Sequence, residues 1–371
     1  MNTDSTPTVH DGLVTATLPA EFKIQLGSFY IEIWGCQMNV YDGGKIADLL
    51  TAAGYNRVFK VEDADIVVLV TCAVRAKAED KVINQIAHWR HQGLISKDTI
   101  IALGGCVGSE LAEEILKLDP TVNIVFGPRT IHRLPMMLGK YVTDRTPVVD
   151  VTADAIDKFD FFPESGVVGP SAFVTIMEGC SNKCTYCIVP YTRGEEQSRP
   201  VVDILDECVS CVAKGVKEIH LLGQNVNSYR GVYEDGTECT FAQLLYEIVA
   251  LPGVLRIRFT TSNPMDFTDD IVAAVKDIPQ IADSIHVPIQ SGSDRILAAM
   301  HRRYTAQSYI KLCEKLRQAR PNIHISSDFI VGFPGETQDD FEETMKVVNT
   351  VGFDQSFSFV YSIRPGTPAA W

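Results

Sequence analysis

The sequence lacks any apolar run near the roughly 20 residues that a membrane-spanning helix requires. Its opening, MNTDSTPTVHDG, also lacks the basic start and the apolar stretch of an export signal. These two absences count against the membrane and secreted classes. They predict a cytoplasmic protein without a membrane partner, with a disordered tail over residues 1–22.

Positive charge is also scarce in this chain. The 33 Lys and Arg residues face 47 Asp and Glu residues, and the net charge is −14. Affinity for nucleic acid depends largely on Lys and Arg side chains that neutralise phosphates. The charge balance therefore counts against a polyanionic partner, and a nucleic-acid assignment needs other support.

Cysteine, by contrast, is abundant, with ten residues in the chain. In a cytosolic protein the thiol pool keeps such residues reduced, so disulfides are not expected. Metal ligation is the better first interpretation.

Apolar, β-branched runs alternate with helical patterns, which is typical of parallel βα units. The first series predicts an open parallel-sheet α/β domain over residues 23–145. Three of its runs, FYIEIWGC, DIVVLVTC and TIIALGGC, end at Cys36, Cys72 and Cys106. Because an open parallel sheet binds ligands at the carboxyl ends of its strands, we expect these three distant cysteines to converge.

Residues 146–170 contain Pro, Gly and mixed charge without a sustained period, which predicts a linker. Residues 171–371 predict a partial (β/α)6 barrel, whose site lies at the carboxyl ends of the strands. Its six strand-like runs are AFVTIMEGC, KEIHLLGQN, LRIRFTTSN, SIHVPIQSGS, HISSDFIVGFPGE and FDQSFSFVYS. The chain stops shortly after the sixth run, so we expect this domain to be truncated at its C-terminal end.

A cysteine triplet follows the first barrel run. Cys180, Cys184 and Cys187 form a C-x3-C-x2-C loop that can wrap one side of a 4Fe-4S cluster. Four cysteine ligands are usual for such a cluster, so three leave one iron open. That iron can bind the amino and carboxylate groups of S-adenosylmethionine (SAM), whose sulfonium bond an electron from the cluster can break. The alternatives are a structural zinc site and ordinary buried thiols.

Around these cysteines the sequence resembles the MiaB-type transfer RNA methylthiotransferases, a radical SAM family, from about Ile31 to the end. The motifs that carry the resemblance include GCSNKCTYCIVPYTRGEEQSRP, WGCQMNVYD, VTCAVRAKAEDKV, GGCVGSE, LLGQNVNSYRG, RFTTSNP, VPIQSGSDRIL and SSDFIVGFPGET. The resemblance implies a second, auxiliary 4Fe-4S cluster on Cys36, Cys72 and Cys106. It also implies methylthiolation of C2 of N6-isopentenyladenosine at position 37 of tRNA, giving 2-methylthio-N6-isopentenyladenosine.

The implied partners are a tRNA anticodon loop bearing isopentenyladenosine, an electron donor protein and a sulfur donor. Position 37 lies in a hairpin loop, where a base can be splayed out and stacked on side chains. Members of the family usually end in a small β-rich RNA-binding domain, which we expect this chain to lack.

Several strand-end residues are expected to contact SAM. Tyr186 is expected to stack on the adenine, with a packing aromatic as the alternative. The GQN sequence that ends the second barrel run is expected to contact the amino group, and the QS sequence that ends the fourth to contact the ribose and adenine. Polar strand caps and ordinary turn chemistry are the alternatives for these two. The expected SAM-binding residues are Tyr186, Gly223, Gln224, Asn225, Gln290 and Ser291.

No catalytic residue is assigned beyond the cluster ligands. Arg193 and Arg199 are interpreted either as ligands of an anionic group of SAM or RNA, or as ion-pair partners of Glu195 or Glu196. Cys208 and Cys211 lie in a helical pattern without a second pair nearby, which favours buried thiols.

Two alternative functions remain open. A sister methylthiotransferase, acting on threonylcarbamoyladenosine in tRNA or on an aspartate of a ribosomal protein, shares both cysteine triplets, although the WGCQMN and FTTSNP motifs favour the isopentenyladenosine branch. A non-catalytic iron-sulfur regulator is the alternative of another class, and SAM cleavage discriminates it.

Overall fold

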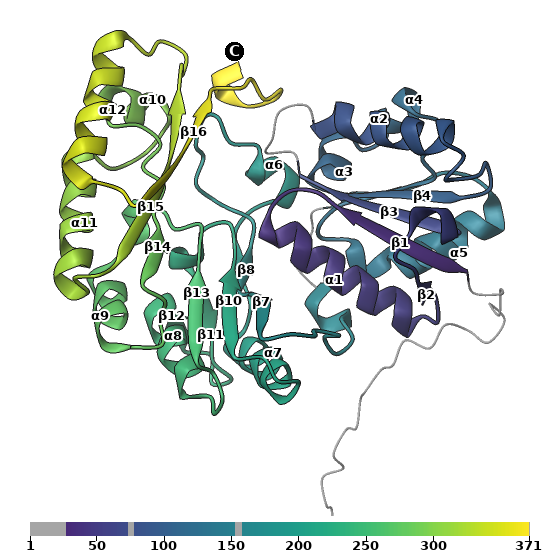
Figure 1. Ribbon diagram of the computed structural model, residues 1–371, viewed down its shortest axis with the longest axis horizontal. Coiled ribbons are helices and arrows are strands. Elements are labelled where there is room, and N and C mark those ends of the chain that lie inside the picture. The colour runs from purple at the N-terminus through teal and green to yellow at the C-terminus, as the bar shows by residue number, and fades with distance from the viewer. Residues whose placement is uncertain (1–26, 73–77, 153–157, 371) are drawn as a thin grey trace, which may run out of the picture.

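The computed structural model describes residues 27–72, 78–152 and 158–370. The tail predicted over residues 1–22 lies outside these ranges. Two α/β units follow one another along the chain, the first in purple and blue and the second in teal to yellow (Figure 1). This confirms the predicted fold class of an open parallel sheet followed by a partial barrel.

The first unit is built on a six-stranded sheet in which all neighbouring strands are parallel, in the order β2-β1-β3-β4-β5-β6. Its strands are β1 (Ser28–Ile33), β2 (Asn56–Arg57), β3 (Ile66–Thr71), β4 (Ile100–Gly105), β5 (Ile124–Phe126) and β6 (Val148–Asp150). From β1 the chain crosses to β2 on one side and then to β3 on the other, so the strand order reverses between β1 and β3. In open α/β sheets, ligands bind in the crevice at such a switch point.

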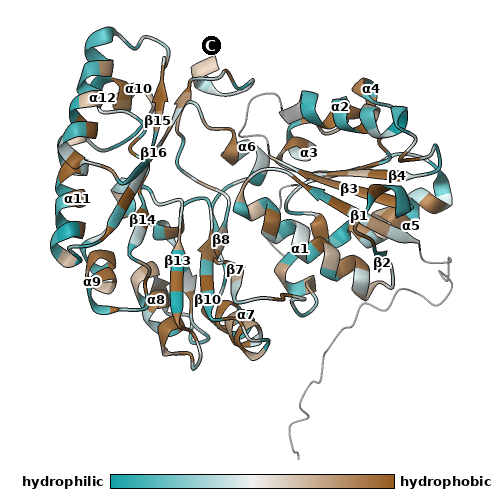
Figure 2. Cartoon of the chain, in the orientation of Figure 1, coloured by the Kyte–Doolittle hydropathy of each residue, from teal (hydrophilic) through white to brown (hydrophobic). Residues whose placement is uncertain are grey.

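Helices cover both faces of this sheet (Figure 1). They are α1 (Gln37–Ala52), α2 (Ala78–His91), α3 (Cys106–Leu111), α4 (Glu114–Leu118) and α5 (Leu134–Asp144). Successive strand residues point to opposite faces. One face of β3 therefore packs with α1 and α5, and the other with α2, α3 and α4. Burial on both faces explains why the strand is apolar from Ile66 to Val70 (Figure 2).

The predicted linker is partly ordered structure. Residues 148–150 form β6, which pairs with β5 as the edge of the sheet, although a three-residue run is too short to stand out in the sequence. The short 3-10 helix Lys158–Phe161 follows, and its Lys158 is completely buried. At Lys158 the described part of this segment is therefore anchored in the protein interior.

The second unit contains all six predicted barrel strands. They form two parallel three-stranded sheets, β13-β10-β7 and β14-β15-β16, joined by a bridge between Ile257 and Ile281. The strands are β7 (Ser171–Thr175), β10 (Glu218–Leu222), β13 (Arg256–Phe259), β14 (Ser284–His286), β15 (His324–Val331) and β16 (Gln355–Val360). The remaining strands form two antiparallel ribbons, β8 (Met177–Glu178) with β9 (Gln197–Ser198) and β11 (Arg230–Val232) with β12 (Glu238–Thr240).

Helices lie outside the barrel strands and bury an apolar face against them (Figure 2). They are α7 (Val201–Ala213), α8 (Phe241–Ala250), α9 (Asp269–Asp277), α11 (Ala306–Ala319) and α12 (Gln338–Val351). Two short helices lie apart from this core: α6 (Val189–Arg193) packs against α3, and α10 (Asp294–Ala299) buries Ile296 in a separate cluster with Met300 and Phe333. Cys208 and Cys211 are buried in the core between α7 and the strands, as predicted for structural thiols. Across the described part of the chain, no helix has the length and apolar character needed to cross a membrane.

Candidate active site

The first cysteine triplet lies at the switch point of the N-terminal sheet. Cys36 is the N-cap of α1 after β1, Cys72 directly follows β3, and Cys106 is the first residue of α3 after β4. Since β1, β3 and β4 are neighbours in the sheet, their carboxyl ends bring the three cysteines to one edge, as the sequence predicted.

Two glycines allow this close approach. A Cβ on Gly35 would lie 2.3 Å from Cys72 Cβ, and a Cβ on Gly105 would lie 2.3 Å from the Thr71 carbonyl oxygen. Both glycines also have positive φ angles, +127° and +84°, which other residues rarely adopt. Each glycine precedes a cysteine of the triplet, so the backbone itself prepares the site.

We predict that Gly35→Ala removes the auxiliary iron and leaves the fold intact. The new methyl group must push Cys72 away from Cys36, so about half of the iron of a two-cluster protein should be lost. Gly44→Ala is the matched control, because a Cβ at this exposed position of α1 meets no atom within 4 Å. That variant should keep its iron and gain about 0.5–1 kcal/mol of helix stability. Iron content and thermal melting measure both effects, and full iron in Gly35→Ala would contradict the prediction.

The environment of Cys36 favours a thiolate. A hydrogen bond from Cys72 lowers its pKa to about 6, helped by the Arg193 charge and by the backbone of Asn39, against the opposing effect of burial. Its place at the N-terminus of a 16-residue helix acts in the same direction. A thiolate is the form that binds iron.

The second triplet lies in the loop after β7 and β8. Hydrogen bonds attach this loop to the end of α10: Thr185 N–H donates to the Met300 carbonyl at 3.2 Å, and Thr185 Oγ1 to the Ala299 carbonyl at 2.9 Å. On the other side, Cys180 N–H donates to the Gly194 carbonyl at 3.1 Å. The loop that carries the three thiols is therefore held at both ends.

These thiols are half-buried and close enough to repel one another as thiolates. Burial raises the pKa of Cys187 to about 12, and the nearby Cys184 and Cys180 act in the same direction. Burial also raises the pKa of Cys180. A bound metal reverses this balance, because its positive charge deprotonates a coordinating thiol.

Both triplets offer the cysteine ligands that an iron-sulfur cluster uses. Within residues 27–72, 78–152 and 158–370, no three Cys, His, Asp or Glu side chains are arranged to hold one metal ion. In a cluster each thiolate binds a different iron, so the ligands stand further apart than around a zinc ion. The ten cysteines are all free thiols, and cysteine thiolates are the usual ligands of such clusters.

The residues predicted to contact SAM lie around the second triplet. Tyr186 packs against the cluster of Ile296, Met300 and Phe333, and its hydroxyl accepts a hydrogen bond from Arg302 at 2.8 Å. Gln224 Oε1 accepts from Gly179 N–H at 2.6 Å, directly before Cys180. Their roles toward SAM stay predictions.

The other residues predicted to contact SAM are buried. Asn225 is 2% exposed, donates to Asp266 and accepts from Asn263 N–H. Ser291 is completely buried and lies 3.4 Å from Thr344 Oγ1. Gln290 has a positive φ of +76°, a conformation that costs energy in non-glycine residues and is enriched at active and ligand-binding sites. Its contact with SAM, like those of Asn225 and Ser291, stays a prediction.

Glu196 is a site residue that the motif reading did not assign. Its carboxylate accepts from Ser228 Oγ at 2.7 Å, and its backbone N–H donates to Ser181 Oγ, beside Cys180. Burial raises its pKa, and the nearby Asp266 adds to the effect. Glu196 directly precedes β9, which pairs with β8 and so brings it back beside the cysteine loop. This position was the one signal for its place at the site.

The cysteine edge of the sheet faces the mouth of the barrel. Thr260, at the carboxyl end of β13, donates to Gln37 Oε1 at 3.2 Å, next to Cys36. From the sheet side, Arg129 donates to the Glu195 carbonyl at 2.6 Å, close to Cys180. The two cysteine triplets therefore border one common space.

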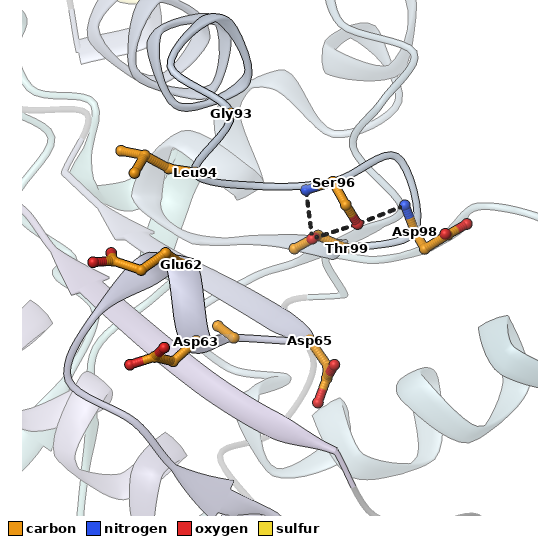
Figure 3. A pocket seen from close by; sticks show the side chains of 9 residues that line it. Glu62, Asp63, Asp65, Gly93, Leu94, Ser96, Asp98 and Thr99 are labelled. Carbon is orange, nitrogen blue, oxygen red and sulfur yellow. Dashed lines mark hydrogen bonds between the residues drawn. The ribbon is translucent and has the colours of Figure 1, made fainter.

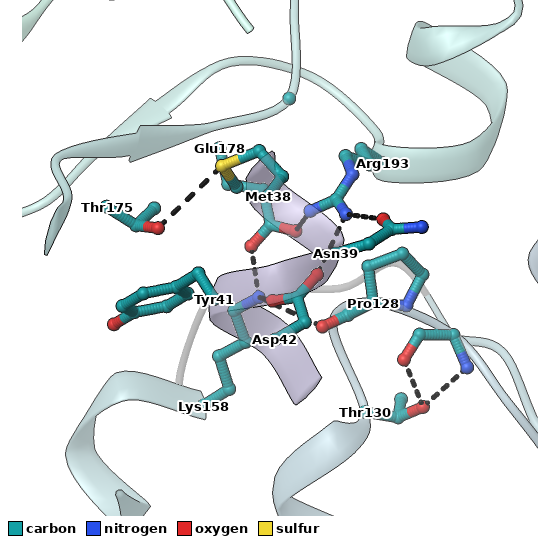
Figure 4. Close-up of polar contacts among 12 residues, drawn as sticks. Met38, Asn39, Tyr41, Asp42, Pro128, Thr130, Lys158, Thr175, Glu178 and Arg193 are labelled. Carbon is teal, nitrogen blue, oxygen red and sulfur yellow. Dashed lines mark hydrogen bonds and ion pairs between the residues drawn. The ribbon is translucent and has the colours of Figure 1, made fainter. Parts of the chain in front are cut away.

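The two arginines of the TRGEEQSRP motif do not pair with Glu195 or Glu196, and that prediction was wrong. Arg193 donates to Glu178 at 2.6 Å and to Asp42 at 2.8 Å (Figure 4). Arg199 instead binds Glu207, which also pairs with Lys45. Both arginines are occupied within the protein, so neither is open to an anionic group of SAM or RNA.

A separate hollow of about 330 Å³ opens at the other end of the N-terminal sheet. It lies where β3 and β4 begin, opposite the cysteines, and Figure 3 shows its acidic lining. The lining residues include Glu62, Asp63, Asp65 and Asp98. Its negative charge and its place at the amino ends of the strands set it apart from the ligand-binding edge.

Comparison with known proteins shows to which class of protein this chain belongs. The model of the Radical SAM superfamily matches residues 174–348, and that of the uncharacterized protein family UPF0004 matches residues 28–127. One solved structure with this fold is the radical S-adenosylmethionine methyltransferase TsrM from Kitasatospora setae, with cobalamin and a 4Fe-4S cluster bound. The TM-score is 0.65 at 15% sequence identity, and the match covers 92% of this chain and 76% of TsrM. The cobalamin-dependent SAM radical enzyme OxsB gives a TM-score of 0.60 at 15% identity, and this chain spans about half of it, 54%. Fold and cysteine loop together define a radical SAM protein.

Sequence similarity narrows this class to one family. A protein of Photorhabdus laumondii named tRNA-2-methylthio-N(6)-dimethylallyladenosine synthase is 54% identical over 342 residues, which are 92% of this chain and 72% of the relative. The chain belongs to the family of tRNA-2-methylthio-N(6)-dimethylallyladenosine synthases.

Proposed function

We propose that this chain transfers a methylthio group to C2 of N6-isopentenyladenosine at position 37 of tRNA. The observation that carries the proposal is the pair of cysteine triplets on facing edges of the sheet and the barrel, in a chain that belongs to this family. The product is 2-methylthio-N6-isopentenyladenosine. Because the substrate is tRNA, we place the enzyme in the cytoplasm.

The cofactors are SAM and two 4Fe-4S clusters. We assign the SAM-binding cluster to Cys180, Cys184 and Cys187, and the auxiliary cluster to Cys36, Cys72 and Cys106. When bound, the SAM-binding cluster would supply the electron that cleaves SAM, and the auxiliary cluster would supply the sulfur. Such cofactors are needed because C2 of an adenine is neither acidic nor a good nucleophile, so acid-base catalysis gains little there.

The protein's own contribution is to hold the reacting groups in position. The hydrogen bonds of Thr185 to α10 fix the cysteine loop, and Gln224 attaches that loop to the end of β10. We place SAM between this loop, Tyr186 and Gln290, and the target base between the loop and Cys36. The contact between Thr260 and Gln37 joins the mouth of the barrel to the sheet edge beside Cys36.

The reaction also needs an electron donor protein and a sulfur donor that restores the auxiliary site after each turnover. The chain carries a net charge of −14, which opposes tight binding to the phosphates of RNA. We therefore assign recognition to the splayed base itself, which stacking can hold without many phosphate contacts.

The test compares tRNA nucleosides, by mass spectrometry, from cells with and without the gene for this protein. Loss of the gene should remove 2-methylthio-N6-isopentenyladenosine, and N6-isopentenyladenosine should accumulate in its place. Unchanged levels of both nucleosides would rule out this substrate. A deficit of a methylthiolated threonylcarbamoyladenosine instead would identify the sister activity.

A further inference from the structure

Arg193 links the two units of the protein from a fully enclosed position. It is 2% exposed and ends α6, the helix that follows Cys187. Its guanidinium binds Glu178 of the barrel unit, and Asp42 and Asn39 of α1 in the sheet unit, at 2.6, 2.8 and 3.3 Å. Only a planar guanidinium supplies several donors in fixed directions, so Lys cannot reproduce all three contacts.

Lys158 completes this group of buried charges. Its ammonium lies 2.6 Å from Glu178, 3.4 Å from Asp42 and 3.0 Å from the Pro128 carbonyl (Figure 4). Two cations therefore balance two carboxylates, and none of the four is more than 2% exposed. We call Asp42, Lys158, Glu178 and Arg193 the buried quartet.

Arg193 is the member of the buried quartet that faces the first cysteine triplet. Asn39 Oδ1 accepts from Arg193 and lies 3.8 Å from Cys36 Sγ, so a single amide group separates the guanidinium from this thiol. Cys106 begins α3, which packs against α6. The positive charge of Arg193 therefore lies next to the thiol of Cys36 and on the helix that packs against the one beginning at Cys106.

A positive charge at this place has a definite consequence for a cluster bound there. A 4Fe-4S cluster on three thiolates is an anion, and reduction adds one more negative charge. Inside a protein, where charges are weakly screened, a nearby cation stabilises the reduced form more than the oxidised form.

We propose that Arg193 is a positioning residue of the auxiliary site, which holds α1 against the segment carrying the second triplet and makes the auxiliary cluster easier to reduce. The proposal rests on the assignment of that cluster to Cys36, Cys72 and Cys106. Arg193 touches neither SAM nor the substrate in this role.

The test is an EPR-monitored redox titration of the full chain with dithionite as the reductant. Cys180, Cys184 and Cys187 are replaced by Ala, so that only the auxiliary cluster gives a signal. In this background Arg193→Met should lower the equilibrium constant for one-electron reduction at least about tenfold, which corresponds to about 59 mV. Arg193→Lys keeps the charge and should stay within about threefold of the parent.

Asp42→Asn should shift the reduction potential of the auxiliary cluster in the opposite direction. It removes a negative charge from the same group, so the cluster should become easier to reduce. A merely structural role predicts damage in the same direction for both variants, whereas an electrostatic role predicts opposite shifts. Where Arg193→Met fails to hold the cluster, the Asp42→Asn shift decides.

Arg302 offers a matched control. It is a partly buried arginine, hydrogen-bonded to Tyr186, which directly precedes Cys187 of the other triplet. Arg302→Met should leave the auxiliary potential unchanged.

The possible failures are distinguishable. Absence of any cluster signal in the background that carries Arg193 would contradict the ligand assignment, and with it the proposed function. A normal signal whose potential does not move in Arg193→Met, or falls in Asp42→Asn, would overturn the role of Arg193 alone.

Discussion

Replacement of Cys180, Cys184 and Cys187 by Ala will abolish SAM cleavage, a loss of at least about a thousandfold, or about 4 kcal/mol of barrier. We assign the cluster that supplies the electron to these three thiols, and the loop that carries them is held in place by α10 and the end of β10. The measurement is 5′-deoxyadenosine formed by reduced, reconstituted protein.

The matched control for this variant is Cys211→Ala. Cys211 is a buried thiol of α7 in the barrel core, and burial raises its pKa. Its loss should leave both iron content and SAM cleavage unchanged. Undiminished cleavage in the triple-alanine protein would remove the basis for a radical enzyme and favour the regulator hypothesis.

The second large effect separates the two halves of the reaction. In Cys36→Ala/Cys72→Ala/Cys106→Ala, methylthio transfer should fall below detection, whereas SAM cleavage continues. These thiols lie in the sheet unit, outside the loop to which we assign SAM binding, so we expect their removal to take away the proposed sulfur supply and about half of the iron. The two products, 5′-deoxyadenosine and the methylthio nucleoside, are measured in one reaction.

This variant also tests whether the two sites are independent. Gly44→Ala, also in the sheet unit, serves as the control with full activity. Loss of all iron, or loss of SAM cleavage together with methylthio transfer, would show that the SAM-binding cluster cannot assemble without Cys36, Cys72 and Cys106.

Much of the fold follows from local sequence. Runs such as IVVLV are apolar because parallel strands are buried on both faces, and the cysteines come at strand ends because turns follow there. The strand β6 escaped prediction because three residues carry too little pattern. Its pairing with β5 depends on tertiary contacts.

The ion pairs could not be assigned in the same way. Arg193 and Asp42 are 151 positions apart, and the local candidates Glu195 and Glu196 were the wrong partners. One signal was available: Asn39, Asp42 and Lys45 recur at intervals of three along α1, so they lie on one face of the helix. That polar face is buried against the second unit, which requires partners of opposite charge there.

The buried quartet also limits how this protein can be recombined. Its four charged residues come from α1, the segment after β6, β8 and α6, so Asp42 of the sheet unit depends for its ion pairs on Lys158 of the connecting segment and on Arg193 of the barrel unit. A chimera that joins the sheet unit of this chain to the barrel of a distant radical SAM enzyme would enclose Asp42 without its partners. The two units are therefore not interchangeable modules, and a working hybrid must carry all four residues across together.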